Sequence, residues 1–392
     1  MLGGNKVLRN SRKVLFALAG SLVLLGAILA FAYTTYQNDV GEVPPVTGTG
    51  QPEIPGVAVP SRWANASFTW VLDNPGTPPL NVDTTDGTNP LPLKTVLINS
   101  ANSWATGSLN GQQLTNLSVA NGNDVTNSPT PQVDCTNVVT FNDNNPADFP
   151  TGTESVAFTT VSTDYVRVGP PQTPGTTYTF TECNNQQTIT TTSPAIVFDA
   201  DIAFNPNVQF STSTPPLSNA IDLQSVATHE FGHALGLDHS GVAHAVMFPA
   251  GDTGESQQRI LSTDDLIGIS FLYPSSTFSS YLGAISGQVT FPNVGGVYAA
   301  HVVAIDASTG NVVVDGLANA DGGYTLYVPP GSYNVLILPL APDDYHGLFS
   351  LSDFSGWSCG YDESAPPCCD TGAGQCLGAA LANPTNFTGK FY

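Results

Sequence analysis

The chain has 392 residues, a formal net charge of −22 and only 10% charged residues. Its acidic balance argues against nucleic acid and anionic membrane surfaces as partners, because both carry negative charge themselves. The length allows two or three domains with a substantial core, and the 38 Gly and 31 Pro residues favour β-rich structure with many loops over a helix bundle.

Residues 1–32 have the pattern of a secretory signal peptide. Four of the nine Lys and Arg residues precede an apolar run over 14–33, and Ala-Phe-Ala at 30–32 is a small-x-small cleavage signal. The alternative is an uncleaved anchor, since about 20 apolar residues can span a bilayer. Both interpretations place the rest of the chain outside the cytoplasm, either secreted or anchored by this segment. Residues 33–60 lack periodicity and are predicted to be a disordered linker.

Residues 61–274 are predicted to form the first folded domain. Alternating apolar residues predict strands, and Val96, Ala101 and Trp104 share one face of a predicted helix. The predicted elements are a strand at 67–72, a helix at 91–106 and strands at 138–141, 155–160 and 196–204. Cys135 with Cys183 is the economical disulfide pairing, because each domain of an exported chain then holds an even number of cysteines.

The segment from His229 to His239 has the pattern of a catalytic metal site. On a helix of about 3.6 residues per turn, His229 and His233 lie about 40° apart, so both imidazoles can meet one ion. Gly236 lets the helix end and the chain reverse, which brings back His239 as a third ligand. Three neutral imidazoles with one open position describe a catalytic zinc site. Glu230 stands beside that position, where a general base can take a proton from a zinc-bound water.

Two further observations support a real site over an amphipathic helix that carries histidines by chance. Three of the six histidines in the chain fall in this segment. Met247, the one methionine besides Met1, lies eight residues after His239. A core methionine is the alternative interpretation of Met247. Asp222 is the expected N-cap of the helix, and Ser262 with Asp265 predicts a capping box for a last helix before Pro274.

The three histidines, the glutamate and the following methionine turn are typical of metzincin proteases. Within that clan, residues 229–240 resemble the active site of the matrixins, and residues 262–274 resemble the helix that closes their catalytic domain. The resemblance implies an α+β catalytic domain, with a twisted mixed sheet and about three helices. It also implies one zinc ion held by His229, His233 and His239, with Glu230 as catalytic base and Met247 supporting the histidines from below.

The resemblance has three further implications. An edge strand above the zinc would pair with extended substrate, and residues 155–160 are the candidate. Asp199 and Asp201 resemble the acid-rich strand that binds calcium in matrixins, and a pair of surface acids is the equally open alternative. Latency through a propeptide cysteine is not expected, because no cysteine precedes Cys135.

Residues 282–340 follow a short linker at 275–281 and change in character. Short alternating strands at 287–291, 301–306, 311–314, 324–328 and 333–338 predict a small all-β antiparallel sandwich. Residues 321–324 (DGGY) and 330–333 (PGSY) resemble carboxypeptidase regulatory-like, transthyretin-like domains. His301 in this part is expected to be structural. Residues 341–392 form a C-terminal extension with four cysteines, for which three disulfide connectivities are open.

We therefore expect a secreted, monomeric zinc endopeptidase that acts on protein or peptide substrates. A membrane partner is expected only if the N-terminal segment stays uncleaved. The alternative function is a catalytically inactive zinc-containing protein that serves in binding or in cell-wall adhesion. The intact Glu230 weighs against an inactive site, because a degenerate site would usually lose its base.

Overall fold

The computed structural model describes residues 58–339 with short gaps, together with three isolated strands. The gaps are residues 75–78, 80, 85–88, 127, 129, 151–154, 167–174, 292–294, 298–299 and 319–321. These three strands are β1 (Lys6–Val7), β2 (Gln37–Asp39) and β22 (Lys390–Phe391). β2 pairs with β3 (Ala58–Pro60) at the start of the main range. The predicted signal peptide, linker and cysteine-containing extension thus lie almost entirely outside the described residues. No helix in the described part is long and apolar enough to cross a membrane.

A mixed sheet forms the centre of the N-terminal part, in the order β1-β9-β12-β8-β5-β7, with β4 also paired to β12. Its longer members are β4 (Arg62–Trp63), β5 (Ser67–Leu72), β7 (Ser118–Asn121), β8 (Val138–Thr140), β9 (Ala157–Tyr165) and β12 (Ala195–Phe204). β9 runs antiparallel to β12, whereas β5, β7 and β8 run parallel to their neighbours. In this strand order β9 is the outermost long strand of the sheet. On its outer side, among the described residues, it pairs only with the short β1 (Lys6–Val7).

The predicted elements of this part are confirmed in type and, for most, in place. The strand at 67–72 has the predicted bounds. β9 continues beyond the predicted 155–160, because its ladder with β12 extends to the pair Tyr165 and Ala195. A mixed sheet with few helices is compatible with the predicted α+β class.

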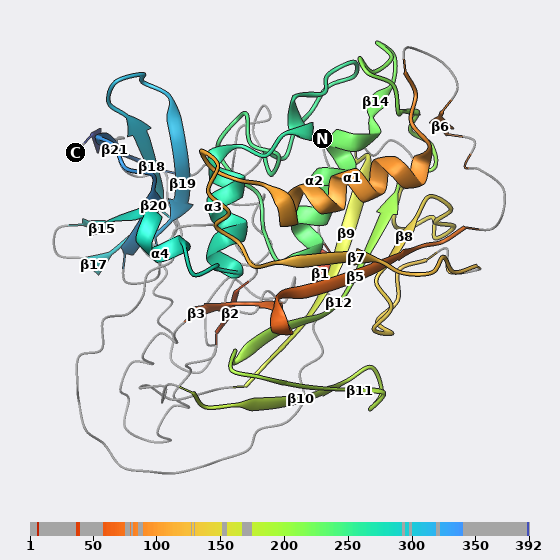
Figure 1. The fold of residues 1–392 in the computed structure, drawn as a ribbon, viewed down its shortest axis with the longest axis horizontal. Coiled ribbons are helices and arrows are strands. Elements are labelled where there is room, and N and C mark those ends of the chain that lie inside the picture. The colour runs from red at the N-terminus through yellow and green to blue at the C-terminus, as the bar shows by residue number, and fades with distance from the viewer. Residues whose placement is uncertain are drawn as a thin grey trace.

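Two helices, α1 (Leu93–Thr106) and α2 (Leu223–Ala234), cover one face of this sheet (Figure 1). Phe231 of α2 packs against Phe68 and Trp70 of β5, with ring centroids 6.4 and 5.2 Å apart. The Trp104 indole of α1 donates a hydrogen bond of 2.8 Å to the carbonyl of Thr228 in α2. These aromatic contacts fix α2 against both the sheet and α1.

The opposite face of the sheet carries the hairpin of β10 (Tyr178–Glu182) and β11 (Gln187–Thr191), drawn below the sheet in Figure 1. Phe180 of the hairpin packs with Ile196 and Phe198 of β12. The predicted disulfide between Cys135 and Cys183 is present and ties the hairpin to the segment before β8. Smaller elements are η1 (Ala64–Ala66), η2 (Gln257–Arg259) and a parallel sheet of β6 (Val82–Asp83), β13 (Phe210–Ser211) and β14 (Ile221–Asp222).

Residues 283–339, here called the C-terminal β module, contain small antiparallel sheets. Their strands are β15 (Gly283–Gln288), β16 (Thr290–Phe291), β17 (Gly295–Gly296), β18 (His301–Asp306), β19 (Val312–Leu317), β20 (Gly323–Val328) and β21 (Tyr333–Leu338). β15 pairs with β20, and β18 lies between β19 and β21. The strands at 301–306 and 333–338 have the predicted bounds. The resemblance to carboxypeptidase regulatory-like domains stays a prediction.

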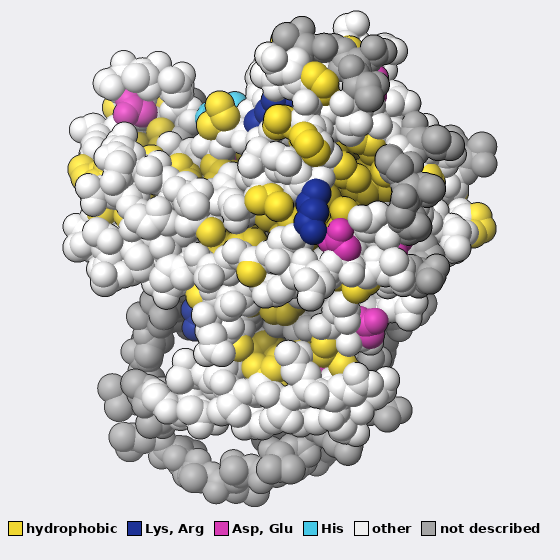
Figure 2. Space-filling model, turned by 45° about the vertical axis from the view of Figure 1, so that its right-hand side comes forward, with side chains coloured by type: hydrophobic (Ala, Val, Ile, Leu, Met, Phe, Trp, Pro, Cys, Tyr) yellow, Lys and Arg dark blue, Asp and Glu magenta, His cyan; other side chains and the backbone are white. Residues whose placement is uncertain are grey.

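Two helices, α3 (Thr263–Leu272) and α4 (Phe278–Tyr281), lie next to the C-terminal β module (Figure 1). Phe278, within the predicted linker, is buried in one apolar cluster with Ile267 of α3 and Leu326 of β20. The chain thus passes from one part to the other inside a common core. Figure 2 shows a surface on which charged side chains are sparse, as the composition predicts.

Candidate metal centre

The start of α2 is fixed by its predicted N-cap. Asp222 Oδ2 accepts a hydrogen bond of 2.9 Å from the backbone N–H of Ser225. Arg259 forms a salt bridge with the same carboxylate, which is buried. A buried carboxylate is stable here because it is both paired and hydrogen-bonded.

The end of α2 is a glycine turn that brings the third histidine back. Gly236 has φ of +103°, the left-handed region that glycine adopts without strain. The N–H of Leu237 donates to the Gly232 carbonyl at 3.0 Å, and the N–H of Gly236 donates to the His233 carbonyl at 2.9 Å. This pair of bonds is the Schellman arrangement of a helix end. A side chain at position 236 would also lie 2.8 Å from the carbonyl oxygen of Ser61.

The structure brings His229, His233 and His239 together, with candidate ligand atoms that all lie within 4.8 Å of one another. His229 Nδ1 lies 2.6 Å from the Val246 carbonyl oxygen, and His233 Nδ1 lies 2.9 Å from the Leu237 carbonyl oxygen. These bonds assign the proton to Nδ1 in both rings and leave Nε2 as the metal ligand. The two Nε2 atoms are 3.0 Å apart, so they converge on one position.

His229 and His233 fit a zinc ion by charge as well as by position. All three are buried. Burial, with the nearby His239, lowers the pKa of His229 to about 3. Burial and the two neighbouring rings also hold the pKa of His233 well below its ordinary value. Neutral imidazole is the form that binds a metal, so the folded chain presents ligands that need not lose a proton first.

Glu230 is fully buried beside this trio. Burial raises the pKa of Glu230 to about 8, and a hydrogen bond from Thr159 opposes that rise. The Thr159 hydroxyl on β9 lies 2.6 Å from Glu230 Oε2 and 3.2 Å from the Glu230 backbone carbonyl oxygen. The other carboxylate oxygen, Oε1, has no hydrogen-bond partner among the described residues. Thr159 therefore holds one carboxylate oxygen, and the other is buried without a hydrogen-bond partner among the described residues.

Replacing Thr159 with Val is expected to lower kcat about tenfold for a reaction in which Glu230 acts as a base, since loss of the hydroxyl leaves the carboxylate without its anchor. Zinc content should stay unchanged, because the side-chain hydrogen bonds of Thr159 go to Glu230 and not to a histidine. Steady-state kinetics together with metal analysis would check this. Thr159→Ser is the matched control and should keep most of the activity. Equal kcat for the Val variant and wild type would show that Thr159 does not position Glu230.

Met247 lies under α2, as the resemblance implies. A Cβ atom placed on Gly232 would be only 2.3 Å from Met247 Sδ, so sulfur and helix are in direct contact. Asp265 holds the turn: Oδ2 accepts from the N–H of Val246 at 2.8 Å, and Oδ1 accepts from the N–H of Met247 at 3.1 Å. The predicted capping box of Ser262 with Asp265 is also present. The sequence indicated this helix cap, but not the role of Asp265 in holding the turn.

Asp199 and Asp201 are not surface acids, because both side chains are buried. Asp201 accepts hydrogen bonds of 2.7 Å from the N–H groups of Gln132 and Val138, so it clamps the segment that carries Cys135. Burial raises the pKa of Asp199 to about 7 and that of Asp201 to about 8. The only metal-type cluster of three or more side chains in the described part is the histidine trio. A calcium ion at Asp199 and Asp201 stays a prediction.

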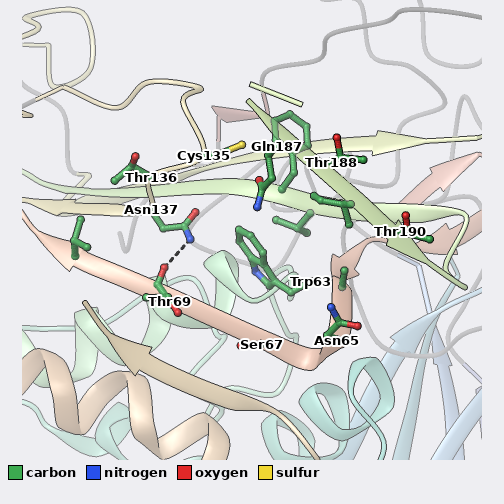
Figure 3. Close-up of a pocket in the computed structure, with 15 residues that line it drawn as sticks. Trp63, Asn65, Ser67, Thr69, Cys135, Thr136, Asn137, Gln187, Thr188 and Thr190 are labelled. Atoms are coloured by element: carbon green, nitrogen blue, oxygen red, sulfur yellow. Dashed lines mark hydrogen bonds between the residues drawn. The ribbon is translucent and has the colours of Figure 1, made fainter. Parts of the chain in front are cut away.

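A cavity of about 490 Å³ lies on the other face of the sheet, away from the histidines. It is bordered by Ser67 and Thr69 of β5 and by Gln187, Thr188 and Thr190 of β11 (Figure 3). The Asn137 side chain points toward Thr69 and donates a hydrogen bond of 2.7 Å to its carbonyl oxygen. None of the side chains that line this cavity is acidic, basic or a histidine, so it offers no acid–base chemistry.

Comparison with known proteins covers the part of the chain that holds the histidines. Residues 175–274 match the matrixin family. Metalloendoproteinase 2-MMP of Arabidopsis thaliana is 36% identical over 111 residues, which are 28% of this chain and 29% of that protein. Metalloendoproteinase 5-MMP of the same plant is 46% identical over 67 residues, 17% of this chain and 18% of that protein. Human matrilysin is 46% identical over 56 residues, 14% of this chain and 21% of that protein.

The matched residues include Glu230, Met247 and all three histidines, but they begin after β9 and end before the C-terminal β module. The chain spans less than a third of the length of each of these curated relatives. Within these limits, the similarity supports a matrixin-type metalloprotease.

Proposed function

We propose that this protein is a secreted zinc-dependent endopeptidase that hydrolyses peptide bonds of protein substrates. The observation that carries the proposal is the buried trio of imidazoles with the carboxylate of Glu230 beside it, one oxygen of which Thr159 holds. Zinc bound by His229, His233 and His239 would supply a Lewis acid that lowers the pKa of a water molecule toward about 7 and polarises a carbonyl group.

The residues of the chain supply proton transfer and hold the reacting groups in position. Glu230 Oε1 takes a proton from the attacking water, and Glu230 then gives that proton to the leaving amine. Thr159 keeps the carboxylate in place through both transfers, because it holds Oε2 and leaves Oε1 open. The carbonyl groups of Val246 and Leu237 hold the rings of His229 and His233 in one orientation.

An extended peptide would bind along β9, because a strand at the border of a sheet offers unpaired backbone groups to an added strand. Thr159 faces Glu230 from this strand, so the added strand would run past the candidate base. β1 pairs with β9 at Thr160 and Val161. Cleavage of the predicted signal peptide, residues 1–32, would remove β1 and open this border to substrate.

The proposal is tested by metal analysis and hydrolysis on the full-length protein. We expect about one zinc per chain, internal cleavage of a mixed peptide library, loss of activity on chelation and its return on adding zinc. Calcium would be measured in the same samples to test Asp199 and Asp201. Zinc without hydrolysis would favour the alternative of an inactive binding or cell-wall adhesion protein. A chain that binds no zinc would overturn both functions.

A further inference from the structure

A buried polar cluster joins the loop after the third histidine to the C-terminal β module. Its members are Ser240 and Gly241, which follow His239, Asp264 of α3, and His301 and Asp315 of the module. The side chains of Ser240, Asp264, His301 and Asp315 are all buried. These contacts cross between parts of the chain that the sequence predicted to be separate domains.

Asp315 is the centre of this cluster. Its Oδ2 accepts a hydrogen bond of 2.8 Å from the N–H of Gly241 and lies 2.6 Å from His301 Nε2. Its backbone N–H donates to Asp264 Oδ1 at 3.0 Å. A residue on β19 thereby holds the backbone two positions after His239.

Ser240 is held from two sides. Its hydroxyl lies 2.7 Å from Asp264 Oδ2 and 3.2 Å from Asp315 Oδ1, and its backbone N–H donates to the Met247 carbonyl at 2.9 Å. The residue next to the third histidine therefore connects the methionine turn to the C-terminal β module. A displacement of Asp315 would shift Ser240 and Gly241. Because these two residues directly follow His239, the third histidine would shift with them.

The cluster lies in a buried interface with apolar neighbours and is not a chance surface contact. Leu109, Leu114 and Ile267 of the N-terminal part belong to one apolar cluster with the core of the C-terminal β module. The rings of Phe271 in α3 and Tyr327 in β20 are 6.0 Å apart. Apolar surroundings make each hydrogen bond to a buried carboxylate valuable, because an unsatisfied partner there would lose its hydration without replacement.

Two carboxyl groups packed against one serine hydroxyl are costly to bury. Burial together with Asp315 holds the pKa of Asp264 well above its ordinary value. Contacts of this kind behind a metal ligand orient the ligand and tune its affinity.

We propose that Asp315 is a positioning residue for the metal centre, acting through Gly241 and Ser240 on His239. The C-terminal β module then helps to position the metal centre and is not functionally independent of the N-terminal part. This inference rests on the proposed zinc site, but it concerns metal affinity and does not require a measured activity.

The test compares zinc affinity of full-length variants by competition with a chromophoric zinc chelator. Asp315→Ala should weaken zinc binding by up to about tenfold, the lower end of the effect of removing a direct hydrogen-bond partner of a metal ligand, because Asp315 acts on His239 only through Ser240 and Gly241. Asp315→Asn should lose less, because its amide oxygen can still accept from the N–H of Gly241. If the Ala variant does not fold, the Asn variant, with a measurable loss of zinc affinity, carries the test.

Leu326→Ala is the matched control, since Leu326 is buried in the core of the same module and takes no part in the polar cluster. It should lower the melting temperature and leave zinc affinity within about twofold of wild type. The inference is overturned if both Asp315 variants bind zinc as tightly as wild type, or if Leu326→Ala weakens binding as much as they do. A wild-type chain that binds no zinc would instead refute the proposed function along with this inference.

Discussion

Replacing Glu230 with Gln is expected to lower kcat for peptide hydrolysis by a factor of about 10³, with zinc still bound. Gln has nearly the same shape, and its amide oxygen can still accept the hydrogen bond from Thr159. The amide cannot take a proton from water at neutral pH, so the step that activates the nucleophile is lost. The change does not alter the three imidazoles or the carbonyl partners of His229 and His233.

Steady-state kinetics on one cleaved peptide, with zinc content and melting temperature measured on the same samples, would check this expectation. Glu255→Gln is the matched control, because Glu255 is an exposed glutamate that is not part of the histidine trio and should leave kcat unchanged. Activity of the Glu230 variant above about a tenth of wild type would show that another group serves as the base. Loss of zinc from that variant would assign Glu230 to metal binding instead.

Replacing Gly232 with Ala is expected to destabilise the fold by about 2 kcal/mol, although helix propensity alone would favour Ala by about 1 kcal/mol. The added Cβ would lie 2.3 Å from Met247 Sδ and 2.7 Å from Trp104 Cζ2. Neither group can withdraw easily: Asp265 holds the backbone of Met247, and the Trp104 indole is bonded to the Thr228 carbonyl. A lower free energy of unfolding for Gly232→Ala would therefore show that packing outweighs helix propensity, and a higher one would show the reverse.

Urea denaturation of the single variants Gly232→Ala and Met247→Ala and of the double variant would measure the coupling. The Gly232 substitution should cost less when Met247 is already Ala, because the closest contact has been removed. Additive effects would mean that sulfur and helix do not press on each other. A stabilised Gly232→Ala variant would show that the methionine turn yields to the helix.

The sequence predicted the helix of the histidines and its two ends well, because the information there is local. The spacing of His229 and His233, the N-cap Asp222 and the turn at Gly236 each depend on neighbours within a few residues, and α2 has this form. For the same reason the strands at 67–72 and 301–306 were predicted with their bounds.

The residues that the sequence did not reveal act across large separations in the chain. Thr159 reaches Glu230 from 71 residues away, and Asp315 reaches Gly241 from 74 residues away. Thr159 and Asp315 both lie within strands, and neither residue stands out there by its type alone. For Asp199 and Asp201 the sequence allows two interpretations, a calcium site and a pair of surface acids. It does not decide between them, because a strand pattern does not show that the segment from Gln132 to Val138 covers these side chains.

The disulfide between Cys135 and Cys183 has a consequence for where this protein can be fully assembled. The bridge spans 48 residues of chain, and that loop contains β9 with Thr159. Closing a loop of this length restricts the unfolded chain and stabilises the fold by about 2–4 kcal/mol. This stabilisation exists only where thiols are oxidised. The redox potential of the surroundings therefore contributes to holding the strand that meets Glu230, so an exported chain and a chain retained in the cytosol are not equally stable.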